Sequence, residues 1–206
     1  MKRALSAWAL ALALTIPAAL PASAAAFSDV AADAWYAQAV EEVTAAGLMN
    51  GVSADAFAPD AEVTRGMVVA VLWRLAGSPQ AETAASFPDV TTGDYYAEAV
   101  AWAQSAGIAA GRADGTFGGS APVTREELAV FLCRYSQHMG QQTAEGVLDQ
   151  YADAGDIQSW ALEGMAHAVG AGLITGLEGN ILDPGGTATR AQLAVILQRL
   201  LIPAVG

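Results

Sequence analysis

A three-residue motif returns along this sequence with a long and nearly constant period. It reads Val-Thr-Arg at residues 63–65 and 123–125, and Ala-Thr-Arg at 188–190, so the copies lie 60 and 65 residues apart. Each copy opens a run of regularly spaced apolar residues, and each run carries a second arginine nine positions after the first: Arg74, Arg134 and Arg199. This pattern predicts a repeat protein whose units bury their apolar faces against one another.

The threonine in each motif predicts the start of a helix. Threonine is a good N-cap because its side-chain oxygen accepts a hydrogen bond from a backbone N–H of the first turn. Thr124 with Glu127, and Thr189 with Gln192, complete a capping box, whereas Met67 leaves the first copy with its threonine alone. Apolar residues then fall at i, i+3, i+4 and i+7 with the same phase in each copy. We therefore expect three equivalent helices that pack together.

A shorter helix is expected earlier in each repeat. It begins beside an aromatic residue and ends at an Ala-Gly pair, where glycine can adopt the left-handed conformation that caps a helix. The expected starts lie near Ala34, Asp94 and Ser159, and the expected ends at Gly47, Gly107 and Gly172. The chain is thus predicted to be mainly α, with three helix-loop-helix repeats at residues 25–78, 86–138 and 148–201.

The first 24 residues have the pattern of a secretory signal peptide. Lys2 and Arg3 precede an apolar run that Pro17 interrupts, and Ala22 and Ala24 provide an A-x-A-like cleavage site. The apolar run is too short and too rich in alanine for a typical membrane anchor. We therefore expect export of the protein and no transmembrane segment in the rest of the chain.

Beyond this leader the chain is strongly acidic. Seven basic residues, all arginine, stand against 21 acidic residues, which gives a formal charge of −14. This balance excludes a general electrostatic footprint for nucleic acid, and anionic lipid surfaces would repel the chain. Six of the seven arginines are the repeat arginines, and the seventh is Arg112. A few arginines at fixed positions on an acidic body indicate local binding of anions.

No pattern in the sequence indicates catalysis or a metal site. His138 and His167 occupy no repeated position, and no motif places a nucleophile beside them. The spacings typical of zinc and calcium sites are absent. Cys133 stands alone in an apolar run and is expected in the core. We expect no enzyme activity, no cofactor and no metal; an exported hydrolase is disfavoured because the repeats leave no residues for a catalytic domain.

The order of these features resembles the S-layer homology repeat. The shared pattern is Phe-x-Asp-Val, Trp-Tyr-x-x-Ala-Val, Gly-x-x-x-Gly, Phe-x-Pro and Thr-Arg, closing on Leu-x-Arg, and it covers residues 27–201 as three copies. The resemblance implies a three-pronged, mainly helical prism with pseudo-threefold symmetry around a central three-helix bundle. It also implies a secreted protein held non-covalently at the bacterial cell wall or S-layer by secondary cell-wall polysaccharide, an acidic and often pyruvylated glycan.

The resemblance places this glycan in grooves between the repeats. The arginine of each Thr-Arg pair would meet the acidic sugar, the first-helix aromatic would stack on it or form a wall, and the second glycine of Gly-x-x-x-Gly would let the backbone approach it. In this chain these residues are Arg65, Arg125 and Arg190; Trp35, Tyr95 and Trp160; and Gly51, Gly111 and Gly176. The first motif, Thr-Arg-Gly-Met, departs furthest from the family form Thr-Arg-Ala-Glu.

Physical chemistry supports this role of the arginines but leaves alternatives open. An arginine in the first turn lies beside free backbone N–H groups, so a carboxylate could receive hydrogen bonds from both. Alternatively, each arginine forms a salt bridge with an acidic residue of a neighbouring repeat, for example Asp29, Asp89 or Asp153, and the aromatics belong to the core. The second arginines lie about 180° round the helix from the first, which favours a structural role for them.

The sequence therefore predicts attachment to the cell envelope through wall polysaccharide. The alternative is a structural S-layer or envelope protein that acts mainly by lateral self-assembly, with a second copy or another envelope protein as its partner.

Overall fold

The computed structural model describes residues 27–201, and the predicted signal peptide lies outside them. The helices of this part, in order, are α1 (Ala37–Ala45), α2 (Arg65–Leu75), α3 (Ala97–Ser105), α4 (Arg125–His138), two single-turn 3-10 helices (Ala154–Asp156 and Ser159–Ala161), α5 (Leu162–Gly170) and α6 (Arg190–Leu201). The predicted mainly α fold is confirmed. None of the helices within residues 27–201 is long and apolar enough to cross a membrane.

Helices α2, α4 and α6 begin where the Thr-Arg motifs predict. Thr64 accepts a hydrogen bond from the backbone N–H of Met67 at 3.2 Å and has no reciprocal partner. The other two caps are complete boxes, because Glu127 and Gln192 also accept from the N–H of the capping threonine, each at 3.1 Å. The difference between the first repeat and the other two is therefore confirmed.

Helices α1, α3 and α5 begin three residues later than the starts expected from the sequence. In the first two repeats a tight turn comes first, with the N–H of Ala37 bonded to the carbonyl of Ala34 at 2.9 Å and that of Ala97 to Asp94 at 3.0 Å. In the third repeat the 3-10 helix at 159–161 takes this place. The glycine caps are confirmed, since Gly47, Gly107 and Gly172 have φ values of 69°, 71° and 67°.

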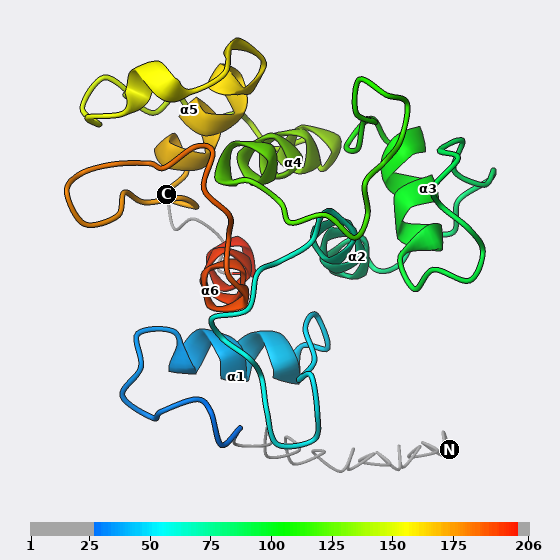
Figure 1. The fold of residues 1–206 in the computed structure, drawn as a ribbon, viewed down its shortest axis with the longest axis horizontal. Coiled ribbons are helices and arrows are strands. Elements are labelled where there is room, and N and C mark those ends of the chain that lie inside the picture. Colours follow the sequence, from blue (N-terminus) through cyan, green and yellow to red (C-terminus); the bar gives the residue numbers. More distant parts are fainter. Residues whose placement is uncertain (1–26, 202–206) are drawn as a thin grey trace, which may run out of the picture.

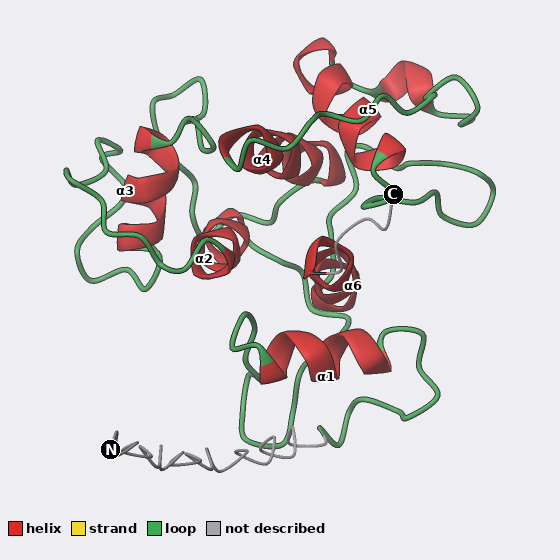
Figure 2. Ribbon diagram, turned by 180° about the vertical axis from the view of Figure 1, so that it is seen from behind, coloured by secondary structure: helices red, strands yellow, loops and turns green. Residues whose placement is uncertain are grey.

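Each second helix packs against the first helix of the following repeat, and not against the first helix of its own. Among the described helices, α2 packs on α3, α4 on α5, and α6 on α1, so the last repeat closes onto the first. Figure 1 shows α2, α4 and α6 toward the middle, with α1, α3 and α5 outside them. The view from behind in Figure 2 shows the same arrangement.

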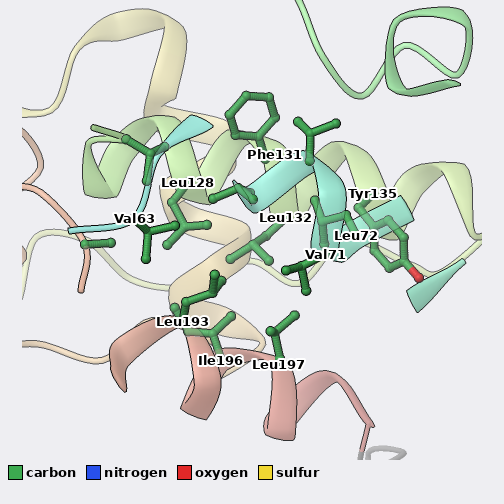
Figure 3. Packing of buried hydrophobic residues seen from close by; sticks show 14 of the residues in the cluster. Val63, Val71, Leu72, Leu128, Phe131, Leu132, Tyr135, Leu193, Ile196 and Leu197 are labelled. Carbon is green, nitrogen blue, oxygen red and sulfur yellow. The ribbon is translucent and has the colours of Figure 1, made fainter. Parts of the chain in front are cut away.

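The apolar stripes of the second helices are buried in one shared core. Leu128 and Leu132 of α4 face Leu72 of α2 and Leu193 and Leu197 of α6 (Figure 3). All five side chains are at most 1% exposed. Cys133 is also buried, as its place in the apolar run predicts. Because every repeat contributes to this core, we expect the three repeats to fold as one cooperative unit.

The segments that lead into the second helices meet at the centre of the molecule. The N–H of Val63 donates to the carbonyl of Ala188, that of Val123 to Val63, and that of Ala188 to Val123, at 2.9, 2.9 and 3.2 Å. The result is a closed ring of three hydrogen bonds, one from each repeat. This ring fixes the positions of the arginines that follow two residues later.

Candidate functional site

The three Thr-Arg arginines are buried and hold the loop of the next repeat. Their exposed fractions are 5%, 4% and 7%. Each donates from Nε to a carbonyl: Arg65 to Phe117 at 2.9 Å, Arg125 to Leu182 at 2.6 Å, and Arg190 to Phe57 at 2.8 Å. Each also donates from Nη2, to the carbonyls of Ala110, Thr175 and Asn50 respectively. Burial lowers the pKa of all three, but arginine stays protonated in proteins.

The aspartates that were alternative partners of these arginines bind the same loops through backbone N–H groups. Asp29 accepts from the backbone N–H groups of Phe57 and Ala58 at 2.8 and 2.7 Å. Asp89 and Asp153 bind the equivalent peptides of their own repeats. These two hydrogen bonds hold the pKa of Asp29 below its ordinary value. Salt bridges with these aspartates are therefore wrong as the alternative, but Arg65 does pair with an acidic residue of a neighbouring repeat: within residues 27–201 the one salt bridge joins Arg65 to Glu127, at 2.9 Å.

The backbone N–H groups at the start of the second helices are also occupied. In α2 the N–H of Arg65 donates to the carbonyl of Ala121 and that of Gly66 to Gly119, at 3.0 and 2.9 Å. The third N–H binds the capping threonine. The starts of α4 and α6 are bonded in the same way to the loops of the third and first repeats. The expectation that a carboxylate docks on these amides is therefore wrong, because the neighbouring repeat already satisfies them.

Three related pockets surround the core, and residues from all three repeats line each one. We name them by their Thr-Arg arginine. The Arg65 pocket is lined by Arg65, the loop at 110–113, one side of α4 that ends at Arg134, and Trp160. The equivalent lining occurs in the Arg125 pocket, with Arg199 and Trp35, and in the Arg190 pocket, with Arg74 and Tyr95. Sequence repeats and pockets thus share one threefold pattern.

The first-helix aromatics form exposed walls of these pockets. Trp35, Tyr95 and Trp160 are 67%, 63% and 55% exposed, so the alternative that they belong to the core is wrong. Other aromatic residues pack against the core instead. They are Tyr96, which follows Tyr95 in the sequence, and the phenylalanines that open the first two repeats. An exposed aromatic ring beside a guanidinium group offers an apolar face and a cation to the same ligand.

The second arginines line the pockets as well, although a structural role was expected for them in place of one in the grooves. Arg74 also has such a structural contact, since its Nη1 donates to the carbonyl of Leu48 at 2.9 Å. Arg199 lies in the Arg125 pocket and also donates from Nη1 to the carbonyls of Gly172 and Leu173, at 3.0 Å each. Together the three pockets contain all seven arginines of residues 27–201 and a single carboxylate, Glu127. The two arginines of one helix line different pockets, which agrees with their positions about 180° apart: on α4, Arg125 and Arg134 lie in the Arg125 and Arg65 pockets.

The glycines expected near the ligand have a different steric cause. A Cβ built on Gly51 would lie 2.5 Å from the ring of Phe27, and one on Gly111 would lie 2.7 Å from Phe87. Gly176 meets the ring of Tyr151 in the same way. Gly51 and Gly111 line their pockets, whereas at Gly176 the flanking residues do so. The close approach that requires glycine is therefore to the opening aromatic residue of the same repeat and, at Gly51, also to the carbonyl oxygens of Ser53 and Ala56.

Comparison with known proteins agrees with this threefold pattern. The sequence matches the S-layer homology domain over residues 26–66, 86–129 and 150–194. The chain belongs to this family. Membership of the S-layer homology family marks it as a cell-surface, cell-wall-associated protein, and the family match is repeated three times as the sequence predicts.

Several curated proteins are similar to this S-layer homology chain over most of its length. An amylopullulanase of Thermoanaerobacterium thermosulfurigenes is 30% identical over 176 residues, which are 85% of this chain but 9% of that protein. The exoglucanase XynX of Acetivibrio thermocellus is 30% identical over 85% of this chain and 16% of its own length. A surface-layer 125 kDa protein of Lysinibacillus sphaericus is 31% identical over 92% of this chain and 16% of its own. The chain thus spans a small part of each relative.

Arg112 is the pocket residue that sequence reasoning did not assign. It lines the Arg65 pocket next to Gly111, outside the six repeat arginines. The sequence does mark this residue out, because Arg112 is the one arginine beyond the leader that has no counterpart in the other repeats. No group of three or more His, Cys, Asp or Glu side chains within residues 27–201 is arranged to hold a metal ion.

Proposed function

We propose that this chain attaches to the cell envelope by binding an acidic wall polysaccharide in its three pockets, without catalysis. The observation that carries the proposal is the distribution of charge. The mature chain is acidic overall, yet every arginine of residues 27–201 lines one of the three pockets. Each pocket has a formal charge of +2, counting Glu127 against the three arginines of the Arg65 pocket. Such sites favour anionic ligands over the rest of the surface.

The lining of the pockets supports a sugar as the ligand. Each pocket combines an exposed aromatic ring with guanidinium groups and a loop that displays backbone groups. An aromatic face accommodates the apolar side of a sugar ring, and a guanidinium binds a carboxylate by two parallel hydrogen bonds. A pyruvylated sugar offers both features, because its carboxylate is fixed to a saccharide ring. Three related pockets on one chain would engage a repetitive polymer with avidity.

Sedimentation with purified cell-wall sacculi tests this proposal. We expect the protein to sediment with intact sacculi, to remain in solution after the secondary polysaccharide is stripped, and to bind less as salt is raised. Arg134→Ala should weaken binding, because Arg134 lines a pocket and makes no side-chain hydrogen bond among the described residues. Gln142→Glu, at an exposed linker position, gives the same change in net charge and should bind as wild type.

Lateral assembly is the competing outcome of the same experiment. Sheets or large particles that form at rising protein concentration without sacculi, with no difference between intact and stripped walls, would contradict polysaccharide binding. Equal sedimentation of Arg134→Ala and wild type would contradict the assignment of the Arg65 pocket.

A further inference from the structure

The Arg65 pocket differs from the other two in volume and charge. Its volume is 460 Å³, against 240 Å³ for each of the others. It contains three arginines and Glu127, whereas the Arg125 and Arg190 pockets contain two arginines and no carboxylate. Gln192 and Met67 stand at the positions equivalent to Glu127. The three pockets therefore share one plan but offer different groups to a ligand.

Arg65 is committed to protein contacts more fully than its two counterparts. Its Nε and Nη2 bind carbonyls of the next repeat, and its Nη1 donates to Glu127 Oε1 at 2.9 Å. Its guanidinium carbon also lies 5.1 Å from the ring centres of Phe117 and Phe131. For Arg125 and Arg190, by contrast, no hydrogen bond of Nη1 is found within residues 27–201. The arginine of the Thr-Arg motif is thus the least available cation in the largest pocket.

Arg112 and Arg134 are the available cations of this pocket. Neither guanidinium donates a hydrogen bond or forms a salt bridge within the described part of the chain. The residues equivalent to Arg112 are Val52 and Leu177, which are 60% and 37% exposed. At this position the other two pockets therefore present an apolar side chain, where the Arg65 pocket presents a charge.

The loop around Arg112 leaves room for its side chain at Gly118. The guanidinium lies against Gly118, where an added Cβ would come 2.8 Å from the guanidinium carbon. The residues equivalent to Gly118 are Ala58 and Asp183, and all three have positive φ values of 71°, 58° and 50°. Glycine is therefore not needed here for backbone conformation alone, since alanine and aspartate adopt it elsewhere. The arginine and the glycine that makes room for it occur together, in one repeat of the three.

We propose that Arg112 and Arg134, and not Arg65, bind the anion in this pocket, and that the pocket selects a doubly charged saccharide. This inference rests on the proposed function of the pockets. A doubly charged group matches two uncommitted guanidinium groups, and the larger volume admits a larger substituent. The Arg125 and Arg190 pockets suit a singly charged sugar with an apolar substituent, which Leu177 or Val52 would contact.

Binding of glucose 6-phosphate and glucuronate to the full chain tests the proposal. The phosphate monoester carries close to two negative charges near neutral pH, whereas glucuronate carries one. The indole N–H resonance of Trp160, assigned with Trp160→Phe, reports the Arg65 pocket in an NMR titration. We expect wild type to bind glucose 6-phosphate about tenfold more tightly there, because one further charge-assisted contact contributes about that factor.

Three variants sharpen this test. Arg112→Leu copies the third repeat and should remove the preference for the phosphate. Gly118→Ala should do the same without deleting any charge, because its Cβ displaces the Arg112 side chain. Leu177→Arg/Asp183→Gly transfers the pair to the Arg125 pocket, where Trp35 should then report a gained preference. Gln142→Ala, at an exposed linker position outside the three pockets, is the control and should leave the Trp160 titration unchanged.

Two results would overturn the inference. One is an unchanged preference in Arg112→Leu and Gly118→Ala, and the other is no shift of Trp160 with either sugar. Protein that still sediments with intact sacculi in those cases would leave the proposed function standing. Loss of wall sedimentation in the wild type would refute the proposed function itself.

Discussion

The two arginines of helix α4 come from the same sequence pattern but have different surroundings and line different pockets. Arg125 is 4% exposed, and its Nε and Nη2 donate hydrogen bonds to carbonyls of the next repeat. Arg134, nine residues later on the same helix, lines the mouth of another pocket and forms no side-chain hydrogen bond within residues 27–201. Within α4, the arginine of the Thr-Arg motif therefore holds the loop of the next repeat, while the arginine nine positions later remains available for a ligand.

The largest effect is expected on stability, when Arg125 and Arg134 are replaced in turn. Arg125→Met should lower the free energy of unfolding by about 3 kcal/mol or more, because the buried carbonyls of Leu182 and Thr175 lose their donor. Arg134→Met, on the same helix, is the matched control and should change it by less than about 0.5 kcal/mol. Urea denaturation followed by circular dichroism measures both. Equal stabilities of the two variants would contradict the structural role of Arg125.

An intermediate effect on stability and wall binding is expected when the second arginines Arg134 and Arg199, which line different pockets, are replaced. Arg199 donates to two backbone carbonyls, so Arg199→Ala should cost about 1 kcal/mol of stability. Arg134→Ala should cost almost none, since it has no such bonds within residues 27–201. Both should weaken wall binding to a similar extent in sedimentation assays. If binding follows the stability ranking, the loss reflects unfolding and the ligand role of the second arginines is wrong.

The smallest expected effect concerns His167, which joins the second and third repeats away from the pockets. It is 3% exposed, accepts from the N–H of Ala144 at Nδ1 and contacts Ser136 Oγ at Nε2, at 3.0 and 3.1 Å. Nε2 therefore carries the proton and donates to Ser136. Burial lowers the pKa of His167 below its ordinary value of 6.5, although Glu163 opposes this shift.

A folded-state pKa below the unfolded one makes stability depend on pH in a definite direction. The unfolded chain binds more protons between the two pKa values, so stability is complete above pH 6.5 and declines as pH falls below it. His167→Gln keeps an acceptor and a donor and should flatten this slope between pH 7 and 5. The aspartates that bind the loops do not interfere, because their pKa values lie below 3.8. Parallel slopes for wild type and variant would contradict the assignment.

Much of the fold follows from local sequence rules. Thr64, Thr124 and Thr189 mark the helix starts because capping acts between residues three apart, and Gly47 and its equivalents mark helix ends because only the local backbone decides them. Helix pairing did not follow from these rules. An apolar stripe shows that a helix is buried but not against which partner, so the packing of α2 on α3 and of α6 on α1 required the structure.

The sequence pointed to the arginines and aromatics of the candidate site, but it did not reveal what each of them contacts. The partners of the Thr-Arg arginines lie 45 to 140 positions away in the sequence, so no local pattern reveals that these side chains are satisfied by carbonyls. The sequence did not decide whether the first-helix aromatics lie in the core or in a pocket, because large apolar side chains are usually buried. Their exposure follows from the turn at the start of each first helix, which leaves Trp35 outside and Tyr36 packed against the core.

The exposed aromatic residues and the second arginines, which line the pockets, are proposed to bind wall polysaccharide. The triple variant Trp35→Ala/Tyr95→Ala/Trp160→Ala tests this proposal most directly, because these side chains are more than half exposed and should contribute little to stability. We predict unchanged cooperative unfolding and a loss of affinity for purified wall polysaccharide of at least about a hundredfold, measured by isothermal titration calorimetry. A folded triple variant that binds the polysaccharide as tightly as wild type would contradict the account.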